Sequence, residues 1–270
     1  MSVYPSQVEV NDKNIDKVIA TYKGAYKEIL SEIGAATDWG VANRRAILKQ
    51  IEKILTDLGQ DVNDFIAKEL PGYYKDGADD AIKQLQNIDA PIEVSTGFNR
   101  IHKDAILALV DETSAAFGEG LAGVNRKAQL VFGRMSREAI TQKLASGMIK
   151  GEALRQTRKE IKGLIMEDGL DALVDRAGRS WSLDRYAEML IRTKAVETRN
   201  RGIVNRLVEN DYDLVQVSSH SGSCDTCAEW EGKILSASGA TRGYPTIAQA
   251  EAGGLFHPNC RHAINVLIPS

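Results

Sequence analysis

The sequence predicts a mainly α-helical protein with a small α+β domain in its C-terminal part. Proline is absent between Pro91 and Pro245, which permits long helices through the middle of the chain. Apolar residues recur there in steps of three and four, the spacing of an amphipathic helix. The few strand-like runs gather around one stretch, His220 to His262, which holds all three cysteines and three of the four histidines. We therefore expect long helices followed by a few strands around a Cys/His cluster.

Two apolar stripes predict the N-terminal helices. The first stops at Gly34, and the second is expected to end before Pro71, because proline inside a helix removes a hydrogen bond and clashes with the preceding turn. Their alternating steps suit helices packed along one another. We therefore expect helices over 15–34, 47–70 and 78–85, followed by an extended linker over 89–97.

The second half of the chain continues with helical patterns over 106–110, 128–144 and 154–165. Ser182 is expected to cap a helix that runs to about Val208, with Asp184 favourably placed in its first turn. Strands are predicted over 214–218 and 263–268. The resulting division is an N-terminal helical hairpin (1–90), a linker and helical connection (91–150) and a C-terminal domain (151–270).

The composition is that of an ordinary globular protein, with 43% hydrophobic and 26% charged residues. A net charge of −3 gives no general attraction to nucleic acid. We expect no secretory signal, because the first residues lack a basic region followed by an apolar one. No apolar run approaches the roughly 20 residues of a membrane span. Three cysteines grouped together suggest a reducing compartment and no disulfide framework.

The Cys/His stretch predicts a structural zinc site. Cys224-x2-Cys227 is the usual spacing for one turn that offers two sulfurs, and His257-x2-Cys260 would bring two more ligands from a second turn. With His262 there are five candidates for a tetrahedral ion, so one histidine is expected to lie outside the ligand set. The alternatives are three reduced, buried thiols, or a redox pair of the first two cysteines that lacks an oxidoreductase setting.

The physical role expected of zinc is to hold a glycine-rich span, residues 232–254. Such a span buries little apolar surface and loses much backbone entropy on ordering. One Zn²⁺ contributes on the order of 10–16 kcal/mol in small zinc peptides. Asp225 and Asn259 are expected to orient ligand groups.

Four arginines spaced by seven form one ridge on the predicted helix after Ser182: Arg185, Arg192, Arg199 and Arg206. We expect a solvated face, partly neutralised by neighbouring carboxylates. The alternative is contact with phosphates or with an acidic protein surface, which would weaken with salt.

An enzyme is not expected. Glu229 and Glu231 are close enough to the cysteine turn to be considered as general bases, but the order of motifs differs from that of the zinc deaminases. The run 257–262 has the histidine and asparagine of an HNH nuclease without its magnesium-binding acid. Arg192, Ser218 and these glutamates follow the order of an ADP-ribosyltransferase signature, with a short serine-to-glutamate gap.

Four motifs in order carry a family resemblance: Trp181-x4-Tyr186-x-Glu-Met189-x2-Arg192-Thr193, Asp213-Leu-Val-x-Val-Ser218, Cys224-x2-Cys227-x2-Trp230-x-Gly232 and Gly254-Leu-Phe-His257-Pro-Asn-Cys260-Arg-His262. The pattern resembles the C-terminal domain of phage minor capsid proteins. It is similar to the phage minor capsid protein 2 group and, more distantly, to the Mu F-like head-morphogenesis proteins. The likeness covers roughly residues 150–270, and the N-terminal helices match only in being helical.

The resemblance implies a virion component, present in a few copies inside the head near the portal vertex and in the host cytoplasm during assembly. It implies a role in capsid assembly, DNA packaging or ejection, with the portal protein as partner and the major capsid or scaffold protein and phage DNA as further ones. It also implies that the five Cys/His residues are the family's presumed metal ligands. Relatives of this domain have been compared with the ADP-ribosyltransferase fold, so an enzyme of that kind, or an HNH-like nuclease, stays the alternative.

Overall fold

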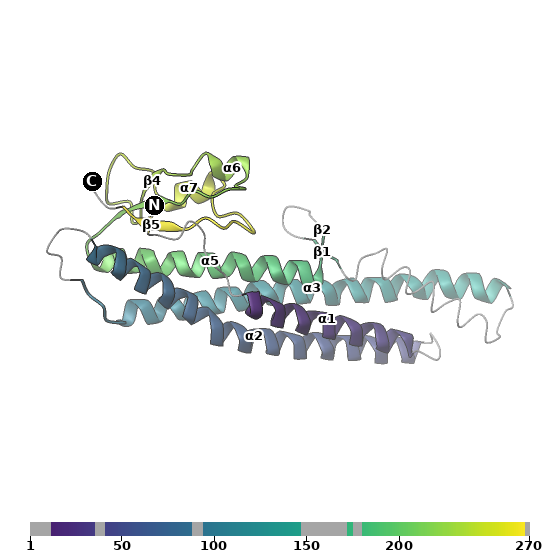
Figure 1. Ribbon diagram of the computed structural model, residues 1–270. Coiled ribbons are helices and arrows are strands. Elements are labelled where there is room, and N and C mark those ends of the chain that lie inside the picture. The colour runs from purple at the N-terminus through teal and green to yellow at the C-terminus, as the bar shows by residue number, and fades with distance from the viewer. Residues whose placement is uncertain (1–11, 36–40, 88–93, 147–171, 175–179, 268–270) are drawn as a thin grey trace. The chain divides into compact units, whose positions relative to one another are not determined.

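A computed structural model describes residues 12–35, 41–87, 94–146, 172–174 and 180–267 (Figure 1). The described helices are α1 (Asp12–Gly34), α2 (Val41–Gln86), α3 (Arg100–Ser146), α5 (Leu183–Glu209), α6 (Asp225–Ala228) and α7 (Ile247–Ala252). The described strands are β1 (Ala172–Val174), β2 (Ser180–Ser182), β3 (Leu214–Val217), β4 (Ile234–Ser236) and β5 (Ile264–Val266). The predicted fold class, long helices with a small C-terminal sheet, is confirmed.

The chain forms two compact units that interleave segments from both halves of the sequence. Unit 1 consists of Met1–Ile15, Phe65–Thr113 and Met189–Ser270, and unit 2 of Asp16–Asp64 and Ser114–Glu188. The predicted domains 1–90, 91–150 and 151–270 stay a prediction. Among the described helices, none combines the length and the apolar character needed to cross a bilayer.

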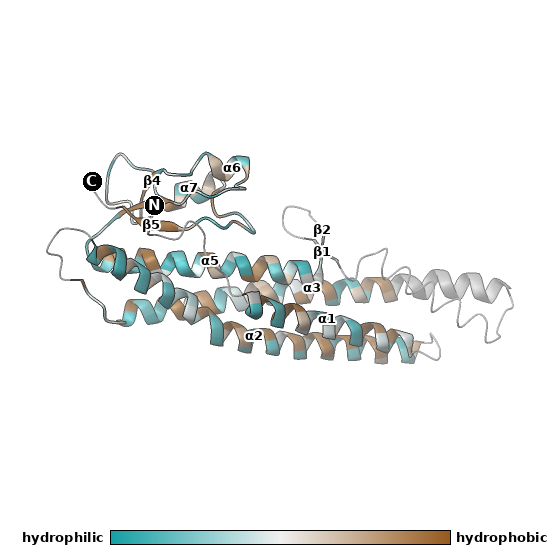
Figure 2. Ribbon diagram, viewed as in Figure 1, coloured by the Kyte–Doolittle hydropathy of each residue, from teal (hydrophilic) through white to brown (hydrophobic). Residues whose placement is uncertain are grey.

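Unit 2 is built from apolar helix faces (Figure 2). The stripe predicted for the first helix is buried or half-buried along its length, and α1 ends at Gly34 as expected. Tyr22 of α1 lies against Phe117 of α3, with ring centroids 6.4 Å apart. The other buried apolar residues of this unit include Val18, Ile29, Ile33, Ile51, Leu55, Leu58, Val62, Val124 and Phe132.

The predicted end of the second helix before Pro71 is wrong, because α2 continues through this proline to Gln86. The separate helix predicted over 78–85 is the last part of α2. A proline in a helix interior costs about 3 kcal/mol. Burial of the neighbouring apolar side chains offsets that cost, since each contributes about 1.5–3 kcal/mol. The buried apolar stripe runs through the proline, with Leu70 before it and Tyr74, Ala78, Ala81 and Leu85 after it.

One helix, α3, joins the two helical patterns predicted over 106–110 and 128–144. Asn99 precedes it and accepts hydrogen bonds at Oδ1 from the backbone N–H groups of Ile101 and His102, the role of an N-cap. Residues 94–97 of the predicted linker, and the two residues after them, are neither helix nor strand. The structure does not describe residues 89–93 of this linker. The helical pattern predicted over 154–165 also lies outside the described residues.

The small sheet has the order β4-β3-β5 with all neighbours antiparallel, and it lies along α5 within unit 1 (Figure 1). The predicted strands over 214–218 and 263–268 are confirmed as β3 and β5, whereas β4 and the β1–β2 pair were not predicted. Helix α5 begins immediately after Ser182, as expected. The core beneath the sheet includes α2 and α5 as well as the strands: Ala81, Leu85, Ile203, Leu207, Val215, Val217, Leu235, Ile264 and Val266.

Glycines let α2 and α5 approach backbone to backbone inside unit 1. A Cβ added to Gly202 would lie 2.1 Å from the carbonyl oxygen of Tyr74, and one added to Gly77 would lie 2.0 Å from that of Arg199. Carbonyl groups inside a helix cannot move away as a flexible side chain can. The crossing therefore depends on the absence of a side chain at both positions.

We expect Gly202→Ala to lower the free energy of unfolding by about 2–3 kcal/mol, because overpacking forces the helices apart. Gly72→Ala in α2 is the matched control: its Cβ would meet no atom within 4 Å. The control should gain up to about 1 kcal/mol from helix propensity. Urea unfolding of both variants measures the difference, and equal midpoints would show that the crossing tolerates a methyl group.

Candidate metal centre

The first turn of the candidate site is the start of α6. Cys224 is the N-cap residue, with extended backbone angles, and Cys227 lies one turn later in the helix. The Ala228 N–H donates to the carbonyl of Cys224, which closes the turn. Both sulfurs therefore project from one short turn, as the Cys-x2-Cys spacing predicted. Cys224 is exposed and Cys227 is buried.

The second turn holds His257 and Cys260, whose backbone N–H donates to the His257 carbonyl at 2.8 Å. Asn259 between them adopts a left-handed conformation with φ 66°, which asparagine tolerates better than most residues. Its backbone N–H donates to Thr193 Oγ1 on α5 at 3.1 Å. This bond attaches the turn to the long helix.

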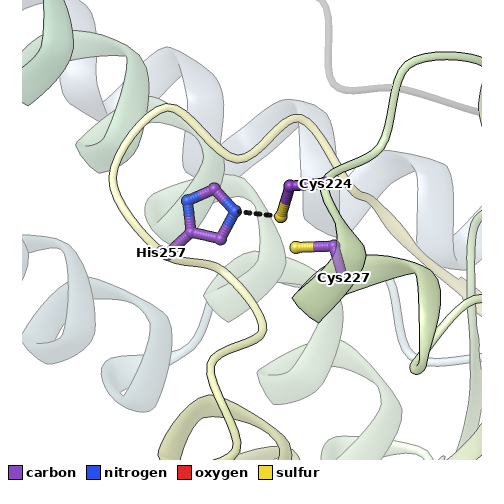
Figure 3. A group of neighbouring side chains, drawn as sticks. All are labelled: Cys224, Cys227 and His257. Carbon is purple, nitrogen blue, oxygen red and sulfur yellow. Dashed lines mark hydrogen bonds between the residues drawn. The ribbon is translucent and has the colours of Figure 1, made fainter.

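The two turns meet at their sulfur and imidazole groups (Figure 3). The Sγ of Cys224 lies 3.1 Å from His257 Nε2, and the Sγ of Cys227 lies 3.7 Å from that of Cys260. His262 brings its Nδ1 to 3.3 Å from the sulfur of Cys260. Two overlapping triads could each hold a metal ion, and they share Cys227: Cys224, Cys227 and His257, and Cys227, Cys260 and His262.

These separations can be compared with a tetrahedral zinc site. Zn–S bonds of about 2.3 Å place two sulfurs about 3.8 Å apart, and a sulfur and a nitrogen about 3.6 Å apart. The distance between Cys227 and Cys260 fits the first value. The two sulfur–nitrogen distances are somewhat shorter than the second. A disulfide between these sulfurs is excluded, because its S–S bond is about 2.05 Å long.

The pKa values of two thiols in the cluster are shifted in opposite directions. Burial raises the pKa of Cys227, and the sulfur of Cys260 raises it further, because two neighbouring thiolates repel each other. The pKa of Cys224 is lowered, first by the backbone N–H of Cys227 and also by His257. A divalent cation between the sulfurs would remove the repulsion and stabilise both thiolates, so the donor set suits a metal.

His262 is attached to a group that was not predicted as its partner. It is 1% exposed, and its Nε2 lies 2.9 Å from Glu231 Oε1. Burial lowers the pKa of His262, although Glu231 acts in the opposite direction. The neutral ring, which is the form that binds metals, is therefore favoured. The ring of His220 lies beside it, with centroids 4.2 Å apart.

Sequence reasoning missed two residues of this cluster. Glu231 was considered only as a general base, and His220 marked the start of the stretch without a role. His220 lies near His262 because β3 and β5 pair, with Val217 opposite Ile264. Glu231 is brought there because the segment before β4 pairs with the other side of β3, where the Gly232 N–H donates to the Val217 carbonyl. No local spacing signals this contact. The predicted orienting role of Asp225 and Asn259 stays a prediction.

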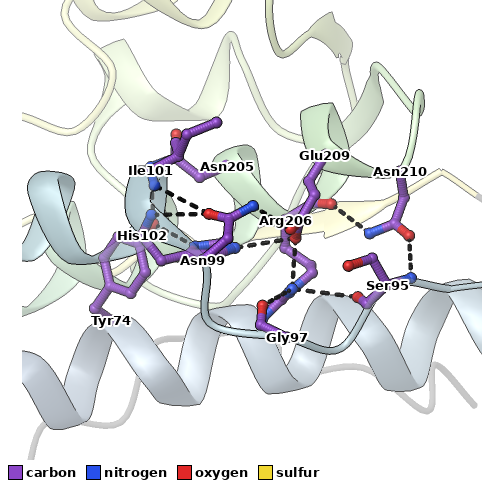
Figure 4. Close-up of polar contacts among 10 residues, drawn as sticks. All are labelled: Tyr74, Ser95, Gly97, Asn99, Ile101, His102, Asn205, Arg206, Glu209 and Asn210. Atoms are coloured by element: carbon purple, nitrogen blue, oxygen red, sulfur yellow. Dashed lines mark hydrogen bonds and ion pairs between the residues drawn. The ribbon is translucent and has the colours of Figure 1, made fainter.

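The arginine ridge does not form a solvated face, so that expectation is wrong for two of its members. Arg199 is 6% exposed and pairs with Asp80 of α2 at 2.6 Å. Arg206 is fully buried and donates to Glu209 and to the carbonyls of Ser95 and Gly97 (Figure 4). The seven-residue spacing was read correctly, but α2 and the segment before α3 cover this side of α5.

Asp213, before β3, holds part of the glycine-rich span. Its carboxylate accepts hydrogen bonds from the backbone N–H of Ser238 at 2.7 Å, from that of Thr241 at 3.0 Å and from the hydroxyls of Ser236 and Ser238. Burial acts to raise the pKa of Asp213, but these hydrogen bonds outweigh it and hold the pKa well below its usual range. The carboxylate of Asp213 is therefore an anchor for this part of the span.

This anchor predicts an acid-dependent stability difference. A carboxyl group with a depressed folded-state pKa stabilises the protein above its unfolded pKa of about 3.9, and that contribution is lost as the pH falls through the folded value. We expect Asp213→Asn to lower the urea midpoint of unfolding at pH 7. Below pH 4 the midpoint of the variant should approach that of the wild type. Asp211→Asn, at an exposed neighbouring position, is the control. A gap that stays constant with pH would contradict the assignment.

The residues of the enzyme alternatives have other contacts. Ser218 Oγ accepts a hydrogen bond from the Ala263 N–H and is buried beside the sheet. Glu231 binds His262 and the backbone N–H of His220. Glu229 is exposed at the end of α6. His257 contacts Cys224 in the cysteine turn, and the backbone N–H of Asn259 donates to Thr193 of α5.

Long helices, a three-stranded sheet and a partly buried Cys/His cluster define a helical protein with a candidate metal-binding domain. The family model described as phage minor capsid protein 2 matches residues 12–270. The chain therefore belongs to the phage minor capsid protein 2 family, as its motifs suggested.

A relative named "Structural protein" from Lactococcus phage LL-H is 30% identical over 100 residues. The alignment covers 34% of this chain and 27% of the relative, so most of the relative's length has no counterpart in the match. No solved structure matches the chain. The family description and this relative's name both refer to structural proteins of phages.

Proposed function

We propose that the protein is a minor component of the phage head that docks on the portal protein inside the capsid and acts during assembly, packaging or ejection. The observation that carries this proposal is the family match over residues 12–270, which includes the long helices as well as the Cys/His domain. Assembly would take place in the host cytoplasm before the particle matures. The major capsid or scaffold protein would be a further contact.

The proposal includes one structural Zn²⁺ in the C-terminal domain. Cys224, Cys227, Cys260 and His257 are its ligands, because they supply three thiolates and one imidazole from two turns. Structural zinc sites are closed by four protein ligands, which matches this set. When bound, the ion would neutralise the thiolates and fix the turns against α5. The chain's own residues position these ligands: the start of α6, the turn at Asn259 and the bond from that turn to Thr193.

Two of the four arginines in the ridge are unavailable to DNA, because they form ion pairs inside the protein. Arg199 and Arg206 bind groups of this chain, and Arg185 is the exposed member of the four. We therefore infer that phage DNA is not held along the whole ridge. From Asp213 onward the chain has three Lys/Arg residues and five Asp/Glu residues, a balance that disfavours contact with DNA there.

Co-expression with the portal protein of the same genome tests the main proposal. The tagged full-length chain should retain the portal protein on an affinity column, and mass spectrometry of purified particles should find the chain in a few copies. As a control, the major capsid protein expressed alone with the tagged chain should not be retained in the same amount. A chain that elutes free of the portal protein and is missing from mature particles would refute the proposal.

A further inference from the structure

We propose that His220, Glu231 and His262 form a second metal position, with two imidazoles and one carboxylate, that takes Zn²⁺ or another divalent transition metal. This inference rests on the proposed function in one respect: His257 must close the thiolate site, so that His262 is available to the second one. Imidazole and carboxylate ligands suit zinc, nickel and related ions.

The three ligand atoms converge from different parts of the small domain. They lie within 4.8 Å of one another, and His262 Nε2 is 2.9 Å from Glu231 Oε1. The backbone N–H of Ser218 donates to the carbonyl of Ala263, and the Ala263 N–H donates back to Ser218 Oγ. This reciprocal pair fixes the end of β3, before His220, against the residue that follows His262. The backbone N–H of His220 also donates to Glu231 at 3.1 Å.

The hydrogen bonds of His220 leave one nitrogen ready to bind. Its Nδ1 lies 3.1 Å from the carbonyl oxygen of Ser221, so Nδ1 carries the proton and donates. Nε2 then has a free lone pair, yet this atom is buried and has no hydrogen-bond partner among the described residues. A histidine that binds a metal commonly donates its other ring N–H to a backbone carbonyl. A bound cation would satisfy the buried nitrogen.

His262 can serve the second position without leaving the first site incomplete. Its Nδ1 faces the sulfur of Cys260 at 3.3 Å, so an Nδ1–H would donate to that thiolate. Its Nε2 would then present a lone pair to the ion shared with Glu231 and His220. The five candidate ligands of the sequence therefore divide into four that close the thiolate site and one that belongs to the second position.

A cavity gives the second position room and access. It has a volume of about 460 Å³, and its lining includes both imidazoles of the second position as well as Cys224 and His257. Three protein ligands leave a coordination position for water, which a closed structural site does not have. This second position lacks thiolates. We therefore expect it to release its metal more readily than the thiolate site does.

Metal stoichiometry of the full-length protein tests the inference. The chain is stripped of metal, loaded with excess Zn²⁺, desalted and measured by native mass spectrometry. The wild type should bind two ions, and both His220→Ala and Glu231→Gln should bind one. Glu229→Gln, at an exposed carboxylate two residues away from Glu231, should still bind two. Far-UV circular dichroism of each variant establishes that the fold is retained.

Loading with Co²⁺ distinguishes this inference from the thiolate site. In His220→Ala the sulfur-to-cobalt absorption should be retained. The variant should bind one equivalent of Co²⁺ fewer than the wild type. One equivalent in the wild type, with that absorption present and unchanged in the variant, would overturn the second position and leave the thiolate site standing. A wild type that binds no cobalt would overturn both sites.

Discussion

Replacing Cys260 by serine is expected to abolish tight zinc binding and to unfold the sheet and its turns. Cys260 is 5% exposed, and its sulfur lies between Cys227 and His262. A serine hydroxyl is a poor substitute for a thiolate as a ligand of zinc. The stabilisation at risk is on the order of 10 kcal/mol, the magnitude found for structural zinc in small domains. This exceeds the whole stability of many domains.

Limited proteolysis with metal analysis measures this effect. In Cys260→Ser, new cleavage sites should appear within residues 214–267, and zinc should fall below one equivalent. Because the core beneath the sheet includes Leu85 of α2 and Leu207 of α5, the parts of these helices that belong to unit 1 should loosen as well. Unit 2 should keep its protection. Ser221→Ala, at an exposed position in the first loop, is the control, and a Cys260→Ser digest identical to the wild type would count against the zinc site.

Replacing Arg206 by methionine should lower the free energy of unfolding by about 3–5 kcal/mol, the cost of removing one partner from a buried ion pair. Arg206 is the fully buried centre of a network that also holds Glu209 and His102 (Figure 4). Without its guanidinium, the carbonyls of Ser95 and Gly97 lose their donor. The carboxylate of Glu209, whose pKa is now lowered by His102 and Arg206 despite its burial, keeps only part of its compensation.

The order of hydrogen bonds around His102 supports this expectation. Asn205 donates to the Tyr74 hydroxyl, which then donates to His102 Nδ1, so that the proton on Nε2 faces Glu209. Each member fixes the ring or rotamer of the next. Such a network is worth more intact than its separate bonds suggest.

Arg185→Met is the matched control for Arg206→Met, because Arg185 belongs to the same sequence ridge but is exposed. Surface substitutions of this kind stay within about 0.5 kcal/mol of the wild type. Urea unfolding of the two variants at pH 7 compares them directly. Equal losses would mean that burial of the guanidinium has no energetic consequence, and the network would then have to be abandoned as a source of stability.

The two arginines show why a periodic pattern predicted a ridge but not its surroundings. A seven-residue spacing establishes that the side chains share one side of a helix. It contains no information about what covers that side. Asp80 pairs with Arg199 across 119 positions of sequence, and Ser95 accepts from Arg206 across 111. Similarly, Pro71 is a local signal to end a helix, and burial of Tyr74 and Leu70 outweighs it.

The sequence by itself determined the helical character, the two strands around the Cys/His stretch and the turn that presents two thiols, because each depends on spacing within a few residues. Its motifs also placed the chain in the phage minor capsid protein 2 family. Only the tertiary structure decided which imidazole faces which sulfur, that Glu231 and His220 adjoin His262, and that two arginines are buried. These contacts join residues that are distant in the chain, and their geometry arises when β3, β5 and α5 pack together.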